Sequence, residues 1–182
     1  MFAGIVDSVQ LQDFGPATLP TRLSDIMKRP PLWKCPKCRR CFANRNQSHS
    51  CGHLGQVDHF RGKPPLIREI FDAFVAMAER CGPVMVLSEK TRIAFQVRMS
   101  FAALMPKRSW VDGHLVLAER RPSSHFRRIE TFSRRNHLHA FRLERVEQLD
   151  REFQDLMRMA YAVGAQQHLD RRATDARSPA KF

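Results

Sequence analysis

Apolar side chains recur at helical spacing in two stretches of the chain. The first follows Gly62-Lys63-Pro64-Pro65, where proline is tolerated in the first turn of a helix, and ends at Gly82-Pro83. The second runs from about residue 146 to residue 168. Their apolar positions are Ile67, Ile70, Phe71, Phe74, Ala78 and Cys81 in the first stretch, and Leu149, Phe153, Leu156, Ala160 and Val163 in the second. This spacing predicts two helices, each with one apolar face.

Between these stretches apolar and polar residues alternate, which is the pattern of β-strands. The clearest alternation covers residues 92–105 and predicts one strand that Pro106 ends. Asp112-Gly113 reads as a turn before a strand over 114–118. Further strands are expected at 84–87, 126–132 and 137–143, with a turn at 134–136. We therefore predict an α+β fold in which two helices cover the apolar face of an antiparallel sheet of about five strands.

The flanking segments divide the chain into four parts. Residues 1–31 are punctuated by prolines and predict an irregular arm with a weak helical turn over 23–28. Residues 32–58 hold a cysteine and histidine cluster, and residues 59–169 hold the predicted α+β domain. The polar residues 170–182 predict a disordered tail.

Composition and charge narrow the class of protein. Apolar residues make up 43% of the 182 positions, enough for a packed core, and no apolar run approaches the ~20 residues of a membrane helix. The first twelve residues lack the pattern of a signal peptide, so we expect a cytoplasmic protein without a membrane partner. The net charge of +13 favours anionic partners such as nucleic acid, although it is also compatible with a role in solubility alone.

Four of the five cysteines lie between Cys35 and Cys51. Cys35-x2-Cys38 has the spacing of a zinc knuckle, because two thiolates so placed can reach one ion above a tight backbone turn. His49-x-Cys51 follows ten residues after Cys38 and completes a set of four ligands. We therefore predict a structural Zn²⁺ held by Cys35, Cys38, His49 and Cys51.

Other interpretations of this cluster stay open. Cys41 or His53 could replace one of the four ligands, and a reduced cluster without metal is the simplest alternative. A catalytic zinc is disfavoured because four protein ligands leave no open position for water. A redox Cys-x2-Cys is disfavoured because no βαβ pattern surrounds it.

Arg39, Arg40 and Arg45 lie between the predicted ligands, so the knuckle itself carries positive charge. These guanidinium groups could contact phosphate while Trp33 or Phe42 stacks on a base. The alternative is that both rings pack inside the module, since so small a unit needs every apolar group for its core.

The polar side of the predicted sheet is a second candidate site. If its basic residues share one face, they form a cationic surface for a phosphate or carboxylate; otherwise they are the solvated outer face of a one-sided sheet. The candidates are Arg92, Arg98, His114, Arg128, His137 and His139. Lys107-Arg108 and Arg134-Arg135 read as solvated loop charges.

Several stretches of the chain resemble a bacterial family, the domain of unknown function 5655. They span Trp33 to about Leu169 and are residues 33–38, 46–51, 62–65, 90–96, 113–117 and 137–143. The resemblance implies no activity of its own. Relatives of this domain occur beside predicted nuclease-like modules, so the resemblance implies an association with nucleic acid.

These observations lead to three functional hypotheses. The first is a zinc-stabilised basic module that binds nucleic acid. The alternatives are a protein-interaction adaptor and a binder of small anions or metabolites on the sheet face. We do not expect an enzyme, because no nucleophile with a paired base is visible in the sequence. The sequence gives no indication of the oligomeric state.

Overall fold

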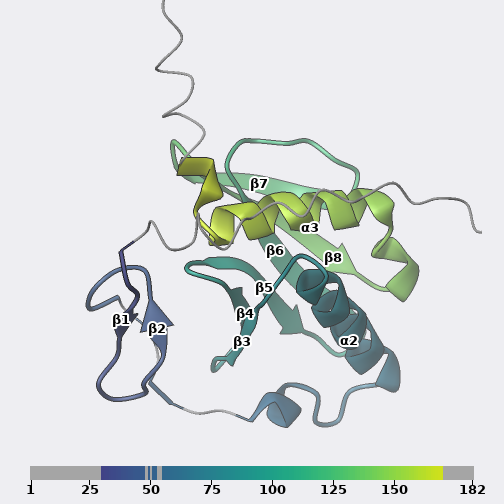
Figure 1. The fold of residues 1–182 in the computed structure, drawn as a ribbon. Helices are drawn as coiled ribbons and strands as arrows, with labels where there is room; N and C mark the ends of the chain where they lie inside the picture. The colour runs from purple at the N-terminus through teal and green to yellow at the C-terminus, as the bar shows by residue number, and fades with distance from the viewer. Residues whose placement is uncertain (1–29, 48, 50, 53–54, 170–182) are drawn as a thin grey trace, which may run out of the picture. The chain divides into compact units, whose positions relative to one another are not determined.

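Most of the described chain is a six-stranded antiparallel sheet with two helices (Figure 1). The structure is a computed structural model that describes residues 30–47, 49, 51–52 and 55–169. The α+β prediction is confirmed, with six strands in the main sheet instead of about five. The helical turn expected over 23–28 and the tail 170–182 lie outside the described residues.

The main sheet has the strand order β3-β4-β5-β6-β8-β7. Every neighbouring pair in it is antiparallel. The strands are β3 (Met85–Ser88), β4 (Ile93–Gln96), β5 (Ser100–Pro106), β6 (Val111–Leu117), β7 (Phe126–Ser133) and β8 (Asn136–Leu143). The edges of the sheet are therefore β3 and β7. β8 lies between β6 and β7 because it pairs with both of them.

The two predicted helices are present as α2 (Pro65–Glu79) and α3 (Arg151–Gly164). Pro65 occupies the first turn of α2, as the sequence predicts. The expected start of the second helix at 146 is wrong, because Asp150 caps the helix by accepting the backbone N–H of Phe153 at 2.8 Å. Short 3₁₀ turns flank the helices at η1 (Gln56–His59), η2 (Val146–Gln148) and η3 (Gln167–Leu169). Within the described residues no helix combines the length and apolarity that crossing a membrane requires.

Both helices pack their apolar faces on the same side of the sheet. The core lies between the helices and the sheet. Phe74 of α2 is fully buried there, and its ring lies 4.9 Å from Phe95, 5.9 Å from Phe141 and 6.1 Å from Phe153, centroid to centroid. One aromatic side chain thus contacts β4, β8 and α3. Such contacts bury large apolar areas and order the sheet and helices together.

The predicted strand over 92–105 is in fact two strands, β4 and β5, that reverse at residues 97–99. The backbone N–H groups of Arg98 and Met99 both donate to the carbonyl of Gly164, at the end of α3 (3.1 and 3.0 Å). Ile93 and Phe101 both reach the core, so the apolar alternation continues across the reversal. The sequence pattern therefore cannot show where the chain turns.

Asp112-Gly113 is not a turn but lies within the first half of β6. The reversal before β6 occurs at 107–110, where the backbone N–H of Lys107 donates to the carbonyl of Trp110 (2.8 Å). Gly113 is required by packing: a Cβ at this position would lie 2.4 Å from Cζ of Phe141. The turn-like dipeptide thus reflects a close approach of strand and side chain.

Candidate metal centre

A short hairpin positions the cysteine cluster. It consists of β1 (Trp33–Lys34) and β2 (Cys41–Phe42), which pair antiparallel. Between them the backbone N–H of Cys35 donates to the carbonyl of Arg40 and that of Arg39 donates to the carbonyl of Cys35, both at 2.9 Å. Arg39 has a φ of 61°, and the left-handed conformation lets the chain close this turn. The hairpin therefore directs two thiols to one side.

Cys35, Cys38, His49 and Cys51 lie together, with their ligand atoms all within 4.8 Å of one another. The sulfurs of Cys35 and Cys51 are 3.8 Å apart, and Nε2 of His49 lies 3.2 Å from the sulfur of Cys38 and 3.4 Å from that of Cys51. A tetrahedral zinc site would place two sulfurs about 3.8 Å apart and sulfur and nitrogen about 3.6 Å apart. These four residues could therefore hold a metal ion.

The imidazole of His49 has the tautomer that a metal ligand needs. Its Nδ1–H donates to the backbone carbonyl of Gln47 at 2.6 Å. In the neutral ring a proton on Nδ1 leaves the lone pair of Nε2 facing the sulfurs of Cys38 and Cys51. A second hydrogen bond of this kind orients most metal-binding histidines and makes them better donors.

The surroundings of the Cys35 thiol lower its pKa and favour the thiolate. Hydrogen bonding by the backbone N–H of Cys38 lowers the pKa of Cys35 to about 6, against the opposing effect of burial. Burial raises the pKa of Cys51 instead. Metal binding requires thiolates, so the cluster has one ready ligand, and a cation would stabilise the others.

The core of this module is very small. Phe42 is buried, and its ring lies 4.2 Å from that of His49 and 6.1 Å from that of Trp33, centroid to centroid. Phe42 therefore packs inside the module and is not exposed for stacking on a base. Among the described residues of the module, Cys35, Cys38 and Phe42 are the buried ones, and units with so small a core usually depend on a crosslink, a metal or oligomerisation.

Among the described residues, Cys41 is the other cysteine of this segment, and it is not one of the four that converge. Cys41 is on β2, where it pairs with Lys34. His53 is outside the described residues. Arg39 and Arg45 are exposed, and Arg40 donates to the carbonyl of Gly52 at 3.0 Å.

The strand register separates the predicted sheet-face residues into two groups. One row crosses the sheet on the side away from the helices and contains Leu87, Ala94, Ala103, His114, Ala140 and Arg128. His137 and His139 pair with Leu117 and Leu115 of the core instead. The two histidines therefore lie on the opposite face from His114, and the structure does not bring the six basic candidates together.

All three arginines among these candidates have nearby polar partners. Arg92 pairs with Glu89 at 2.6 Å, and Arg128 pairs with Glu130 at 2.6 Å. Arg98 Nε donates to Oε1 of Gln166 at 2.9 Å. These contacts fix the side chains locally and place them on three different parts of the domain.

His114 is half-buried among the alanines of its row. Burial, together with the positive charge of Arg92, lowers the pKa of His114 to about 4. The imidazole is therefore neutral at physiological pH and adds no positive charge to this face.

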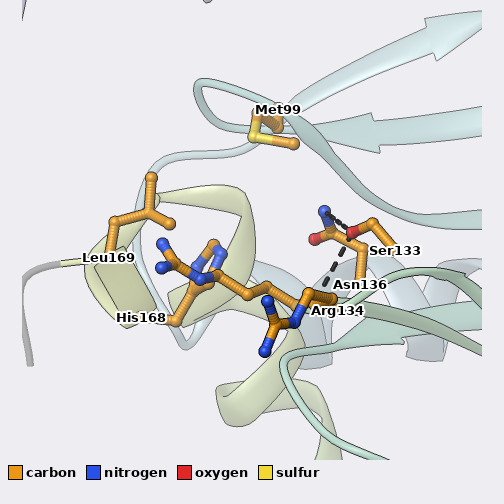
Figure 2. Close-up of a pocket in the computed structure, with 7 residues that line it drawn as sticks. Met99, Ser133, Arg134, Asn136, His168 and Leu169 are labelled. Atoms are coloured by element: carbon orange, nitrogen blue, oxygen red, sulfur yellow. Dashed lines mark hydrogen bonds between the residues drawn. The ribbon is translucent and has the colours of Figure 1, made fainter. Parts of the chain in front are cut away.

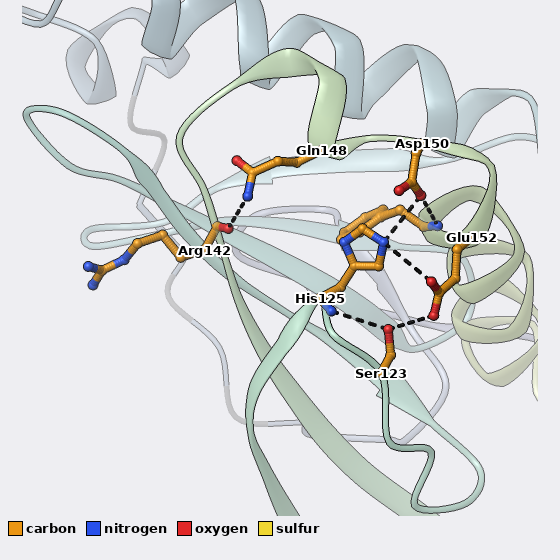
Figure 3. Close-up of polar contacts among 7 residues, drawn as sticks. Ser123, His125, Arg142, Gln148, Asp150 and Glu152 are labelled. Atoms are coloured by element: carbon orange, nitrogen blue, oxygen red, sulfur yellow. Dashed lines mark hydrogen bonds and ion pairs between the residues drawn. The ribbon is translucent and has the colours of Figure 1, made fainter.

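A polar cluster at the start of α3 was not predicted from the sequence (Figure 3). His125 Nε2 lies 3.2 Å from Oδ1 of Asp150 and 3.8 Å from Oε2 of Glu152, while Ser123 Oγ donates to Oε1 of Glu152 at 2.7 Å. The imidazole and the hydroxyl thus both face Glu152 rather than each other. This arrangement lacks the hydrogen bond from serine to base that nucleophilic catalysis needs, and it instead fixes the loop before β7 to the helix.

Comparison with known proteins gives one match. The family model described as Domain of unknown function (DUF5655) matches residues 56–164, more than half of the chain. The match begins after the cysteine cluster, so it covers the sheet, both helices and η1. No curated protein and no solved structure matches the chain.

Proposed function

The chain belongs to the DUF5655 family, and we propose that its residues 32–58 form a zinc-stabilised basic module that binds nucleic acid through phosphate contacts. The convergence of Cys35, Cys38, His49 and Cys51 supports the metal most directly. Three thiolates and one imidazole suit Zn²⁺, which prefers tetrahedral sulfur and nitrogen ligands. Four protein ligands close the coordination sphere, so the ion has a structural role and not a catalytic one.

The charge of the module supports a polyanionic partner. Between Asp25 and Asp58 the chain has no acidic residue. Residues 32–58 contain five basic residues, Lys34, Lys37, Arg39, Arg40 and Arg45. Three thiolates with one Zn²⁺ contribute a net charge of −1, so the folded module stays basic. The exposed side chains of Arg39 and Arg45 suit contacts with phosphate oxygens.

Metal analysis of the purified protein tests the zinc site. We expect one zinc per chain in the wild type and in Cys41→Ser, because Cys41 lies outside the group of four ligands. Cys51→Ser should lose zinc or bind it weakly. Absence of zinc from the wild type, or equal loss in Cys41→Ser, would overturn this ligand set.

Titration of a fluorescent single-stranded 20-mer, as DNA and as RNA, tests the partner. Affinity should fall steeply as salt rises, because phosphate contacts release counterions. Arg39→Gln/Arg45→Gln should flatten the slope of log K against log salt by about 1.4, or roughly 0.7 for each lost contact. Arg61→Gln/Arg68→Gln is the matched control, since it removes the same charge from arginines paired with Asp58 and Asp72.

If both double variants flatten the salt slope equally, the binding depends on the net charge of the protein and not on Arg39 and Arg45. If neither the DNA nor the RNA 20-mer binds, the nucleic-acid function is rejected, but the proposed zinc site is unaffected. A protein partner captured in a pull-down that survives nuclease and high salt would then favour the adaptor hypothesis.

The cysteine cluster also bears on the location of the protein. Thiolate ligands stay reduced in a reducing compartment, so we propose that the protein is cytoplasmic.

A further inference from the structure

A hollow of about 370 Å³ lies at the turn between β7 and β8 (Figure 2). It is lined by Met99, Ser133, Arg134, Arg135, Asn136, His168 and Leu169. These residues come from the β4–β5 turn, the β7–β8 turn and η3, which are distant in sequence. The volume is near the lower end of the range for small-molecule sites, so a ligand of modest size would fit.

The lining of this hollow is cationic and polar on one side. Arg134 and Arg135 form the turn itself, and the imidazole of His168 lines the hollow from η3. None of the lining residues is acidic, and the sequence between Glu130 and Glu144 contains no aspartate or glutamate. Guanidinium groups from two consecutive residues that line the same hollow favour a phosphate group, whose oxygens accept several hydrogen bonds at once.

Ser133 supplies a positioned hydroxyl beside the arginines. Its Oγ accepts hydrogen bonds from the backbone N–H of Arg135 (3.4 Å) and from Nδ2 of Asn136 (3.2 Å). With both contacts received by the oxygen, the hydroxyl hydrogen can donate to a bound anion. The turn therefore offers neutral as well as charged donors to one ligand.

The other side of the hollow is apolar. Leu169 is 39% exposed, and Met99 is held in place by Nε2 of Gln166, which contacts its sulfur at 3.4 Å. Gln166 is itself fixed by the hydrogen bond from Arg98. A positioned methionine beside an exposed leucine can cover the flat face of a ring.

We propose that this hollow binds a nucleotide, with the phosphate held by Arg134 and Arg135 and the base against Met99 and Leu169. The nucleotide can be a free mononucleotide or one unit of a strand, because both present the same phosphate and base. The site lies within the DUF5655 match except for η3, and it uses none of the residues of the zinc module. It therefore stands or fails independently of the proposed zinc-dependent function.

NMR titration of the full chain with adenosine monophosphate, inorganic phosphate and adenosine tests this site. We expect the amide resonances of Ser133–Asn136 to shift with the monophosphate and to shift less with either half alone. Arg134→Gln/Arg135→Gln should weaken monophosphate binding roughly ten- to hundredfold, because it removes two charge-assisted contacts. Met99→Ala should weaken the monophosphate but not inorganic phosphate.

Arg127→Gln, which removes one positive charge from β7 outside the hollow, is a control and should leave binding unchanged. Arg39→Gln/Arg45→Gln should also leave it unchanged, which separates this site from the zinc module. A short oligonucleotide that shifts the same amides when the monophosphate does not would identify the strand as the source. Unchanged monophosphate affinity in Arg134→Gln/Arg135→Gln, or no shift of these amides with any probe, would overturn the proposal.

Discussion

Nε2 of His139 accepts a hydrogen bond from the backbone N–H of Arg121 at 3.0 Å. On the other side of the ring, Nδ1–H donates to the carbonyl of His137, also at 3.0 Å. One nitrogen accepts and the other donates, so this fully buried imidazole is neutral and its tautomer is defined. A second ring proton would face the N–H of Arg121, so His139 has a structural role and is closed to an external anion.

The pKa of His139 predicts that acid destabilises the fold. Burial lowers this pKa below its ordinary value of 6.5, and the nearby charges of His137 and Arg120 lower it further. The stability that His139 contributes is therefore fully present above pH 6.5 and is lost as the pH falls, because the unfolded chain takes up the proton first. Urea denaturation between pH 7.5 and pH 5 should show a falling free energy of unfolding.

His139→Gln isolates the contribution of this residue to the pH dependence. Glutamine can still accept from the N–H of Arg121 but does not titrate. The pH dependence should be shallower in this variant, although His59 and His114, whose pKa values are also lowered, leave part of it in place. Parallel curves for wild type and His139→Gln would contradict the assignment.

His114 should remain neutral well below physiological pH. NMR titration of its ring protons should give a pKa of about 4, because the ring is buried and Arg92 is close. Arg92→Ala should raise this pKa, since it removes a positive charge, whereas Arg128→Ala provides a comparison on the same row of the sheet. An ordinary pKa of 6.5 for His114 in the wild type would show that the outer face is more open to water.

Gly113→Ala should destabilise the sheet domain by about 1–3 kcal/mol, the usual cost of overpacking a core. The new methyl group would meet the ring of Phe141 at 2.4 Å and Cδ2 of Leu104 at 2.8 Å. Urea denaturation measures this loss. Gly55→Ala is the control, because its Cβ meets only the flexible carboxylate of Asp58, and the expected change is within ~0.5 kcal/mol. Similar stabilities of the two variants would contradict the close packing of β6.

Removal of the metal should unfold the hairpin but leave the sheet folded. The module has only a minimal core around Phe42, whereas the sheet has a large one that excludes the cysteine cluster. Trp33 and Trp110 are the two tryptophans, so Trp110→Phe leaves Trp33 as a single fluorescent reporter of the hairpin. A chelator should shift its emission to longer wavelength while the amide resonances of β6 and β8 stay in place. Loss of both signals together would mean that hairpin and sheet unfold as one unit.

Local patterns in the sequence were sufficient to predict that both helices exist and which four residues converge, but not where the second helix begins. The apolar spacing in α2 and α3 repeats within one element, so a single face could be identified without knowledge of its partner. Cys35-x2-Cys38 is likewise a local pattern, because the turn that brings the two thiols together lies between them. The grouping of His49 and Cys51 with this turn followed from the chemistry of the ligands.

Tertiary contacts decided what depends on residues distant in the chain. The reversal after Gln96 involves the carbonyl of Gly164, and Gly113 is explained by the ring of Phe141. The sequence could show that His137 and His139 share a face, since strand side chains alternate, but pairing with Leu117 and Leu115 placed that face on the core. Alternation and spacing are fixed by the geometry of one strand or turn, whereas register and facing depend on which other segments pack against it.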